Sequence, residues 1–117
     1  MMETKAENFT EQSWAAIHSA QNIAKESYQQ NIETEHLLMA LIEKSELTAE
    51  IIRQSGGSTK QLKQELKDFI ANQPKLQSSP EATYISRGLN QILEAADKLK
   101  TSFGDSFVSV EHLLLAL

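Results

Sequence analysis

The chain has 117 residues, enough for one domain, and its formal net charge is −5, with 16 acidic and 11 basic side chains. It contains no cysteine, which excludes disulfides and thiolate chemistry and fits a cytoplasmic location. Its lysines and arginines do not cluster and no apolar run could span a bilayer, so we expect neither nucleic acid nor membrane among its partners.

The first half of the chain has the apolar spacing of amphipathic helices. Residues 1–8 are polar, and we expect a flexible N-terminus there. Apolar residues then recur at every third or fourth position from Phe9 to Tyr28, which predicts the first helix. A second helix is expected from an N-cap at Thr34 to about Glu43, and a third over residues 46–54 with Ser45 as its cap.

Turn and capping residues divide the second half. Gly56-Gly57 is expected to end the third helix, and Ser58 is placed to cap a fourth that buries Leu62, Leu66, Phe69 and Ile70. Residues 74–80 are interpreted as a linker. Ser79-Pro80-Glu81 then has the composition of a helix start, so a fifth helix is expected from there to Phe103, ended by Gly104. A sixth is expected from near Ser109.

The chain contains an internal repeat. Residues 32–41 match residues 108–117 at an offset of 76, with six of ten positions identical. Upstream, an offset of 75 after a one-residue gap pairs Phe9 with Tyr84 and Ile17 with Ile92. We therefore predict an all-α fold of two repeats, residues 9–73 and 81–117, packed as a pseudo-twofold helical bundle. The second repeat shows only two of the four helices, so we expect it to be incomplete and the chain to be a fragment.

Two motifs point to a known family. Phe9-Thr10-Glu11 opens the first helix, and Glu-His-Leu-Leu-x-Ala-Leu occurs in both repeats, starting at Glu35 and Glu111. This double cassette resembles the repeat at the head of the Clp AAA+ chaperones. The stretch Gly104-Asp105-Ser106-Phe107-Val108-Ser109-Val110-Glu111 is similar to that of the ClpB type. The resemblance implies a Clp-repeat N-terminal domain, here with its second repeat incomplete.

The resemblance also implies a function and partners. ClpB-type chaperones are hexameric disaggregases that thread polypeptides with ATP and Mg²⁺ and cooperate with the DnaK system. Their N-terminal domain engages unfolded or aggregated polypeptides before threading, so the fragment itself is expected to be a monomer without enzymatic activity or cofactor. An alternative is the adaptor- and substrate-docking domain of a ClpA- or ClpC-type unfoldase that feeds a protease. A free-standing helical enzyme or ligand carrier is a third hypothesis, from another class.

The same resemblance implies the site residues. Thr10, Asp105 and Glu111 match family positions that handle substrate, and an apolar groove in the family matches Leu93 and His112. In ClpC-type domains, hydroxyl–glutamate pairs bind phosphoarginine. Thr10 with Glu35 matches one pair here, whereas Ile85, the expected partner of Glu111, lacks the hydroxyl. The implied substrate-binding residues are Thr10, Asp105, Glu111, Leu93, His112 and Glu35.

Each of these residues also has an ordinary structural interpretation. Glu35 and Glu111 fall in the first turns of helices, where a carboxylate stabilises the helix by about 0.3–1 kcal/mol. Thr10 suits an N-cap, and Asp105 suits the turn after Gly104. The sequence holds no phosphate-binding glycine loop and no paired-histidine zinc motif, so we expect no catalytic, cofactor or metal site, and packed or surface roles for the histidines.

Overall fold

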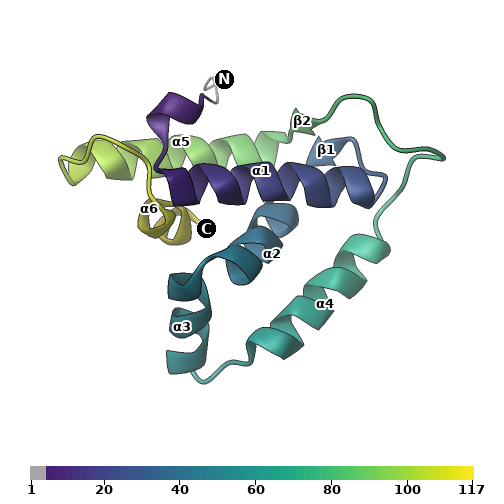
Figure 1. The fold of residues 1–117 in the computed structure, drawn as a ribbon, viewed down its shortest axis with the longest axis horizontal. Helices are drawn as coiled ribbons and strands as arrows, with labels where there is room; N and C mark the ends of the chain where they lie inside the picture. Colours follow the sequence, from purple (N-terminus) through teal and green to yellow (C-terminus); the bar gives the residue numbers. More distant parts are fainter. Residues whose placement is uncertain (1–4) are drawn as a thin grey trace.

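A computed structural model describes residues 5–117. Residues 1–4 of the expected flexible N-terminus lie outside the described residues, while a short 3-10 helix follows directly after them. The fold is mostly helical, as predicted, with one pair of two-residue strands added (Figure 1). The elements are η1 (Ala6–Asn8), α1 (Glu11–Glu26), β1 (Asn31–Ile32), α2 (Thr34–Lys44), α3 (Glu46–Gln54), α4 (Thr59–Ala71), β2 (Tyr84–Ile85), α5 (Arg87–Ser102) and α6 (Val110–Ala116).

Side-chain caps define most helix starts. Thr10, Ser45 and Ser58 each accept a hydrogen bond from the backbone N–H three residues later, so these three predicted caps are confirmed. Two other predicted starts are wrong. Helix α2 has Glu33 as its N-cap, so Thr34 is already helical. The helix expected to start near Ser79 begins instead at Arg87, because the residues before it pair as a strand with β1.

The two repeats correspond at a single offset of 76. Helices α1 and α5 both have 16 residues, and their N-caps Thr10 and Ser86 stand 76 positions apart. Two residues after each helix, Tyr28 and Gly104 both have positive φ, at 58° and 73°. The one-residue gap expected upstream of Ile32 is therefore wrong. Apolar spacing alone permits a slip of one residue, whereas caps and left-handed residues determine the register.

The repeats contact each other reciprocally. The Thr10 N–H donates to the Val108 carbonyl at 3.0 Å, and the Ser86 N–H donates to the Ile32 carbonyl at 3.0 Å. Ser86 corresponds to Thr10 and Ile32 to Val108, so the second bond is the same contact with the roles of the two repeats exchanged. Helix α1 likewise contacts α6, while α2 contacts α5. Exchanged contacts of this kind are what an approximate twofold relation between two copies requires, and they support the expected arrangement.

The core lies where the first two helices of each repeat meet. Leu37, Leu41, Leu89, Leu93 and Leu113 are fully or almost fully buried there. Helices α3 and α4 extend away from this core as two sides of an open triangle with α2 (Figure 1). Because they touch little of the rest of the domain, Phe69 of α4, which we expected to be buried, is exposed, and so are Leu47 and Ile51 of α3. Two aromatic residues after α1 and α5, Tyr28 and Phe103, are exposed as well.

Candidate binding sites

The backbone pairing between the repeats creates a surface pocket of about 280 Å³ beside the start of α1. Phe9 forms a parallel bridge with Val108, which places Thr10 next to the loop between α5 and α6. Asp105, Glu111 and His112 line the same pocket with Thr10. The pocket thus combines the Thr10 hydroxyl with two carboxylates that lie 95 and 101 positions further along the chain, and with the hydroxyls of Ser106 and Ser109.

His112 holds the Asp105 carboxylate. The Ser109 N–H donates to His112 Nδ1 at 2.9 Å, so in the neutral ring the hydrogen sits on Nε2. Nε2 lies 3.0 Å from Asp105 Oδ2 and donates to it. The His112 side chain is buried, whereas that of Asp105 is 54% exposed. One carboxylate oxygen is therefore fixed from inside the protein while the group as a whole faces solvent.

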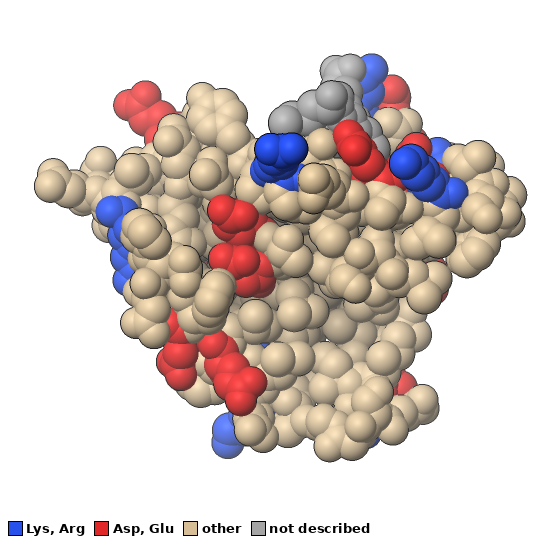
Figure 2. Space-filling model, turned by 180° about the vertical axis from the view of Figure 1, so that it is seen from behind, with Lys and Arg blue, Asp and Glu red and all other residues tan. Residues whose placement is uncertain are grey.

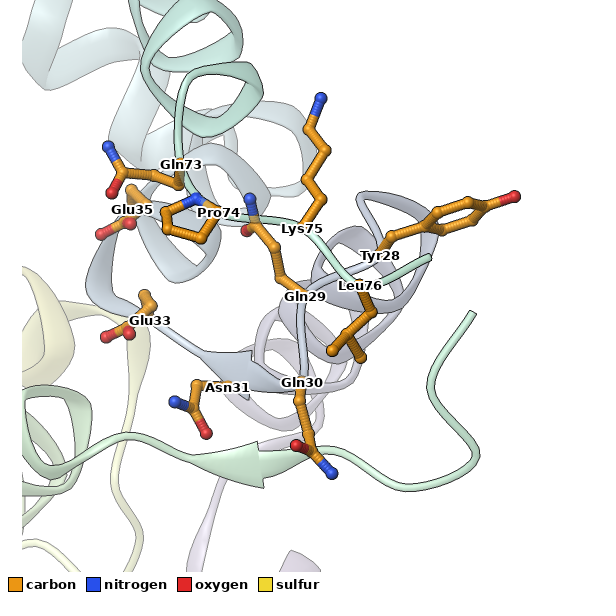
Figure 3. Close-up of a pocket in the computed structure, with 10 residues that line it drawn as sticks. All are labelled: Tyr28, Gln29, Gln30, Asn31, Glu33, Glu35, Gln73, Pro74, Lys75 and Leu76. Carbon is orange, nitrogen blue, oxygen red and sulfur yellow. The ribbon is translucent and has the colours of Figure 1, made fainter. Parts of the chain in front are cut away.

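A second pocket of about 280 Å³ occupies the corresponding place in the first repeat (Figure 3). Gln29, Glu33 and Glu35 line it, 76 positions before Asp105, Ser109 and Glu111. Lys75 and its neighbours after α4 close the other side. Figure 3 shows the Glu33 and Glu35 carboxylates on one side of the pocket, with the Lys75 amino group pointing away from them.

His36 repeats the arrangement of His112 with a neutral partner. Its Nδ1 accepts from the Glu33 N–H at 2.8 Å, and its Nε2 lies 2.6 Å from Gln29 Oε1. Gln29 Nε2 donates in turn to the Ile70 carbonyl at 2.8 Å, which joins α4 to this network. Burial lowers the pKa of His36, and the nearby Glu33 charge opposes that shift only in part.

The structure groups the sequence-predicted residues differently from our expectation. Thr10, Asp105, Glu111 and His112 share one pocket, and Glu35 lies in the other. The expected pairing of Thr10 with Glu35 is therefore wrong, because Thr10 of the first repeat lies in a pocket with residues of the second, whereas the Glu35 pocket is lined by residues 28–76.

Leu93 also differs from expectation. Its exposed fraction is 0%, and it packs in the hydrophobic core between the repeats. The expectation that it lines a surface groove is wrong for this conformation, since a polypeptide could reach it only after the core opened. His112 is likewise buried and acts through Asp105 and the cap of α6. The expectation that the histidines are packed or at the surface agrees with buried His36 and His112 and exposed His18.

Sequence reasoning missed three residues of these sites. Ser86, not Ile85, corresponds to Thr10, so the second repeat does carry a hydroxyl there. Ser13 is buried, and its hydroxyl donates to the Val108 carbonyl at 2.6 Å, which clamps α1 to the α5–α6 loop. Gln29 links His36 to α4. A constant offset of 76 would have identified Ser86 from Thr10 and Gln29 from Asp105; no sequence signal marks Ser13.

Other kinds of site find no support in the described part of the chain. Residues 5–117 contain no group of three or more histidine or acidic side chains arranged to hold a metal ion. None of the described helices is long and apolar enough to cross a bilayer. On the face shown in Figure 2, lysines and arginines are scattered, with acidic side chains beside or between some of them, and form no continuous basic patch.

Comparison with known proteins places this geometry in a family. The model of the Clp repeat N-terminal domain matches residues 8–117. Chaperone protein ClpB of Prochlorococcus marinus is 48% identical over 116 residues, which are 99% of this chain and 13% of that protein. The chain therefore spans only a small part of the length of this relative.

Solved structures share the fold. The Hsp104 N-terminal domain from Candida albicans superimposes with a TM-score of 0.84 at 24% identity, covering 94% of this chain and 73% of that chain. A ClpV N-domain in complex with a VipB peptide gives a TM-score of 0.75 at 20% identity, covering 93% and 66%. Because the family model matches residues 8–117 and the N-terminal part of a ClpB chaperone is 48% identical, the chain belongs to the Clp repeat N-terminal domain family.

Proposed function

We propose that this domain engages unfolded or aggregated polypeptides on behalf of an ATP-dependent disaggregase, and that the pocket around Thr10 is one contact site. The observation that carries the proposal is the convergence of Thr10, Asp105 and Glu111 in one exposed pocket. No lysine or arginine lines this pocket, so the Glu111 carboxylate and the Asp105 oxygen that His112 does not hold can meet lysine, arginine and amide groups of a client. Exposed Phe107 adds apolar surface beside them.

The pocket suits weak and general binding. It is shallow, at about 280 Å³, and Asp105 is held at one oxygen only. Exposed ion pairs contribute about 0.2–1 kcal/mol each. Contacts of this strength can be exchanged quickly among many clients, which fits a domain that presents polypeptide to a threading machine rather than storing it.

The double variant Asp105→Asn/Glu111→Gln tests the proposal. Both substitutions keep the side-chain shape, and asparagine can still accept from His112 Nε2. We expect helicity and the melting temperature to stay close to those of the parent. Binding of fluorescein-labelled casein, followed by anisotropy, should weaken roughly two- to thirty-fold, from two lost ion pairs of about 0.2–1 kcal/mol each.

A matched control separates site from net charge. Glu65→Gln/Glu81→Gln removes the same charge from exposed positions outside both pockets. Its casein affinity should equal that of the parent at 150 mM salt. If both double variants weaken binding equally, general charge rather than the pocket attracts the client, and the site assignment fails.

The rest of the proposed function concerns a longer parent protein. We propose that the parent is a hexameric AAA+ disaggregase that uses ATP and Mg²⁺, works with the DnaK system and acts in the cytoplasm. Similarity to ClpB chaperones supports this proposal. We further propose that this domain on its own is a monomer and binds polypeptide, not nucleic acid or membrane.

The second candidate is docking of the ClpC kind, in which paired hydroxyl and glutamate positions bind phosphoarginine. The observation that favours it is Ser86, which corresponds to Thr10 and restores the hydroxyl in the second repeat. Thr10 shares its pocket with Glu111, and the Ser86 N–H donates to the carbonyl of Ile32, three residues before Glu35. Titration with phosphoarginine in a calorimeter tests this function. Two equivalent binding events, abolished by Glu35→Gln/Glu111→Gln, would establish this function, and a titration without heat of binding would exclude it.

A further inference from the structure

A groove of about 610 Å³ lies between the end of α1, the middle of α2 and the end of α4. It is separate from the pocket around Thr10, and none of the six sequence-predicted site residues lines it. Its floor is apolar, formed by Ile23, Met39 and Ile70, one from each helix. Its volume is about twice that of the pocket around Thr10 or of the pocket around Glu35.

Tyr28, at the edge of this groove, has an unfavourable backbone conformation. Its φ is 58°, in the left-handed region that glycine adopts readily and other residues avoid. The second repeat has Gly104 at the corresponding position, with φ 73°. The turn therefore needs only a glycine, and the backbone gives no reason for a tyrosine. Strain of this kind is commonly retained where a side chain has a function.

The Tyr28 side chain is in the right place for such a function. It lines the groove and also the neighbouring pocket around Glu35, so it forms the wall between them. Its exposed fraction is 44%, large for an aromatic ring. Figure 3 shows the ring pointing away from the other labelled side chains and towards solvent. An exposed aromatic ring beside an apolar floor is a common anchor for a bound peptide.

The charged residues around the groove are divided by sign. Glu26 from α1 and Glu43 from α2 form an acidic side, and Lys67 from α4 and Lys75 from the following segment form a basic side. None of these four side chains takes part in the ion pairs found within residues 5–117. Opposite charges thus face the same apolar floor without neutralising each other, and a ligand can meet both.

The walls of the groove are held in place by hydrogen bonds. The Leu76 N–H donates to the Tyr28 carbonyl at 2.7 Å, which fixes the segment that carries Lys75. Beneath it, Gln29 Nε2 donates to the Ile70 carbonyl at 2.8 Å and holds the end of α4 against α2. Because these walls are already ordered before a ligand binds, less free energy is lost to ordering side chains and loops on binding.

We propose that this groove is a second polypeptide-binding site, and that it takes a short extended segment with an apolar centre, a basic residue at one end and an acidic residue at the other. The basic end meets Glu26 and Glu43, and the acidic end meets Lys67 and Lys75. Packed helices lie about 8–10 Å apart and an extended chain advances about 3.3 Å per residue, so about three apolar residues span the floor. The site extends the proposed function to a second place but does not depend on the pocket around Thr10.

Fluorescein-labelled peptides test the proposal. The probe has a Leu-Phe-Leu centre with two arginines before it and two glutamates after it; one control replaces the centre by serines and another has arginine at both ends. Anisotropy should show the probe binding at least about five-fold more tightly than either control. Amide signals of residues 26–28 and 67–75 should shift on titration with ¹⁵N-labelled domain.

Charge reversal on one side should switch the preference. Lys67→Glu/Lys75→Glu makes all four charged positions acidic, so the peptide with arginine at both ends should replace the mixed probe as the tighter ligand. Lys60→Glu/Lys63→Glu places the same charges on α4 outside the groove and should leave the preference unchanged. Tyr28→Gly folds, because glycine accepts the same φ, and should lose most probe binding, while Tyr28→Phe retains it.

Several results would overturn the proposal. They are equal binding of all three peptides, an identical response of both lysine double variants, and amide shifts that map to α3 instead of the groove. Self-association of the domain that blocks the probe would also overturn it, because a second copy would then be the occupant. The Asp105→Asn/Glu111→Gln variant should bind the probe normally, so failure of the pocket around Thr10 and failure of this groove are distinguishable.

Discussion

Protonation of His36 should destabilise the domain, because the neutral ring satisfies both of its neighbours. Nδ1 accepts from the Glu33 N–H, and Nε2 donates to Gln29 Oε1. A second proton on Nδ1 would point at the Glu33 N–H and leave that cap bond broken. Burial also lowers the pKa of His36 below its usual 6.5, since a buried charge loses its hydration.

The sign of the effect follows from proton binding. Below pH 6.5 the unfolded chain binds a proton at this histidine while the folded protein does not, so the free energy of unfolding falls as the pH falls. The stabilisation is fully present above pH 6.5 and is lost between that pH and the lower pKa of the folded state. If folded His36 stays neutral throughout, lowering the pH from about 7.0 to about 5.5 costs at most ~1.3 kcal/mol.

Urea unfolding followed by circular dichroism at these two pH values measures this loss. In His36→Gln the glutamine can still reach back to the N-cap N–H, as in a capping box, but it no longer titrates. The variant should be less stable overall, yet its stability should fall by up to ~1.3 kcal/mol less than that of the parent. His18→Gln, at an exposed position, should fall as the parent does. Equal falls in all three proteins would refute the assignment of the pH dependence to His36.

Three further substitutions test the fold. Leu93→Ala removes a fully buried side chain and should cost about 2–5 kcal/mol in urea unfolding; a smaller loss would mean that the core between the repeats opens readily. Ser86→Ala removes the N-cap of α5 and should cost about 0.5–2 kcal/mol, and an unchanged melting temperature would contradict its equivalence to Thr10. Gly104→Ala introduces a side chain at positive φ and should lower the free energy of unfolding by about 1 kcal/mol in thermal unfolding. Unchanged stability would contradict the need for a left-handed residue in this turn.

The repeats show how one internal framework supports two different surfaces. In both, a buried histidine accepts through Nδ1 from the N-cap N–H of its own helix and presents Nε2 to the residue seven positions before it. That residue is Gln29 in the first repeat and Asp105 in the second. The histidine position is therefore structural in both copies, and the chemistry of each pocket depends on its exposed partner.

Helix composition and the tandem repeat were predictable from the sequence alone. Apolar spacing, the serine and threonine caps and the duplicated Glu-His-Leu-Leu cassette are local signals, and each follows from the geometry of a single helix. They sufficed for the fold class and the family. Apolar spacing alone could not establish the upstream register, because an amphipathic face tolerates a slip of one residue that a cap does not.

Only the tertiary structure decided which residues meet. The parallel pairings of Phe9 with Val108 and of β1 with β2 connect segments far apart in the chain, and they place Thr10 beside Glu111, away from Glu35. Burial of Leu93 and exposure of Tyr28 likewise depend on how α4 and the second repeat pack, which no spacing within one helix encodes. Capping and apolar spacing within each segment determine the helices, but long-range contacts between the two copies determine the surface that the domain presents.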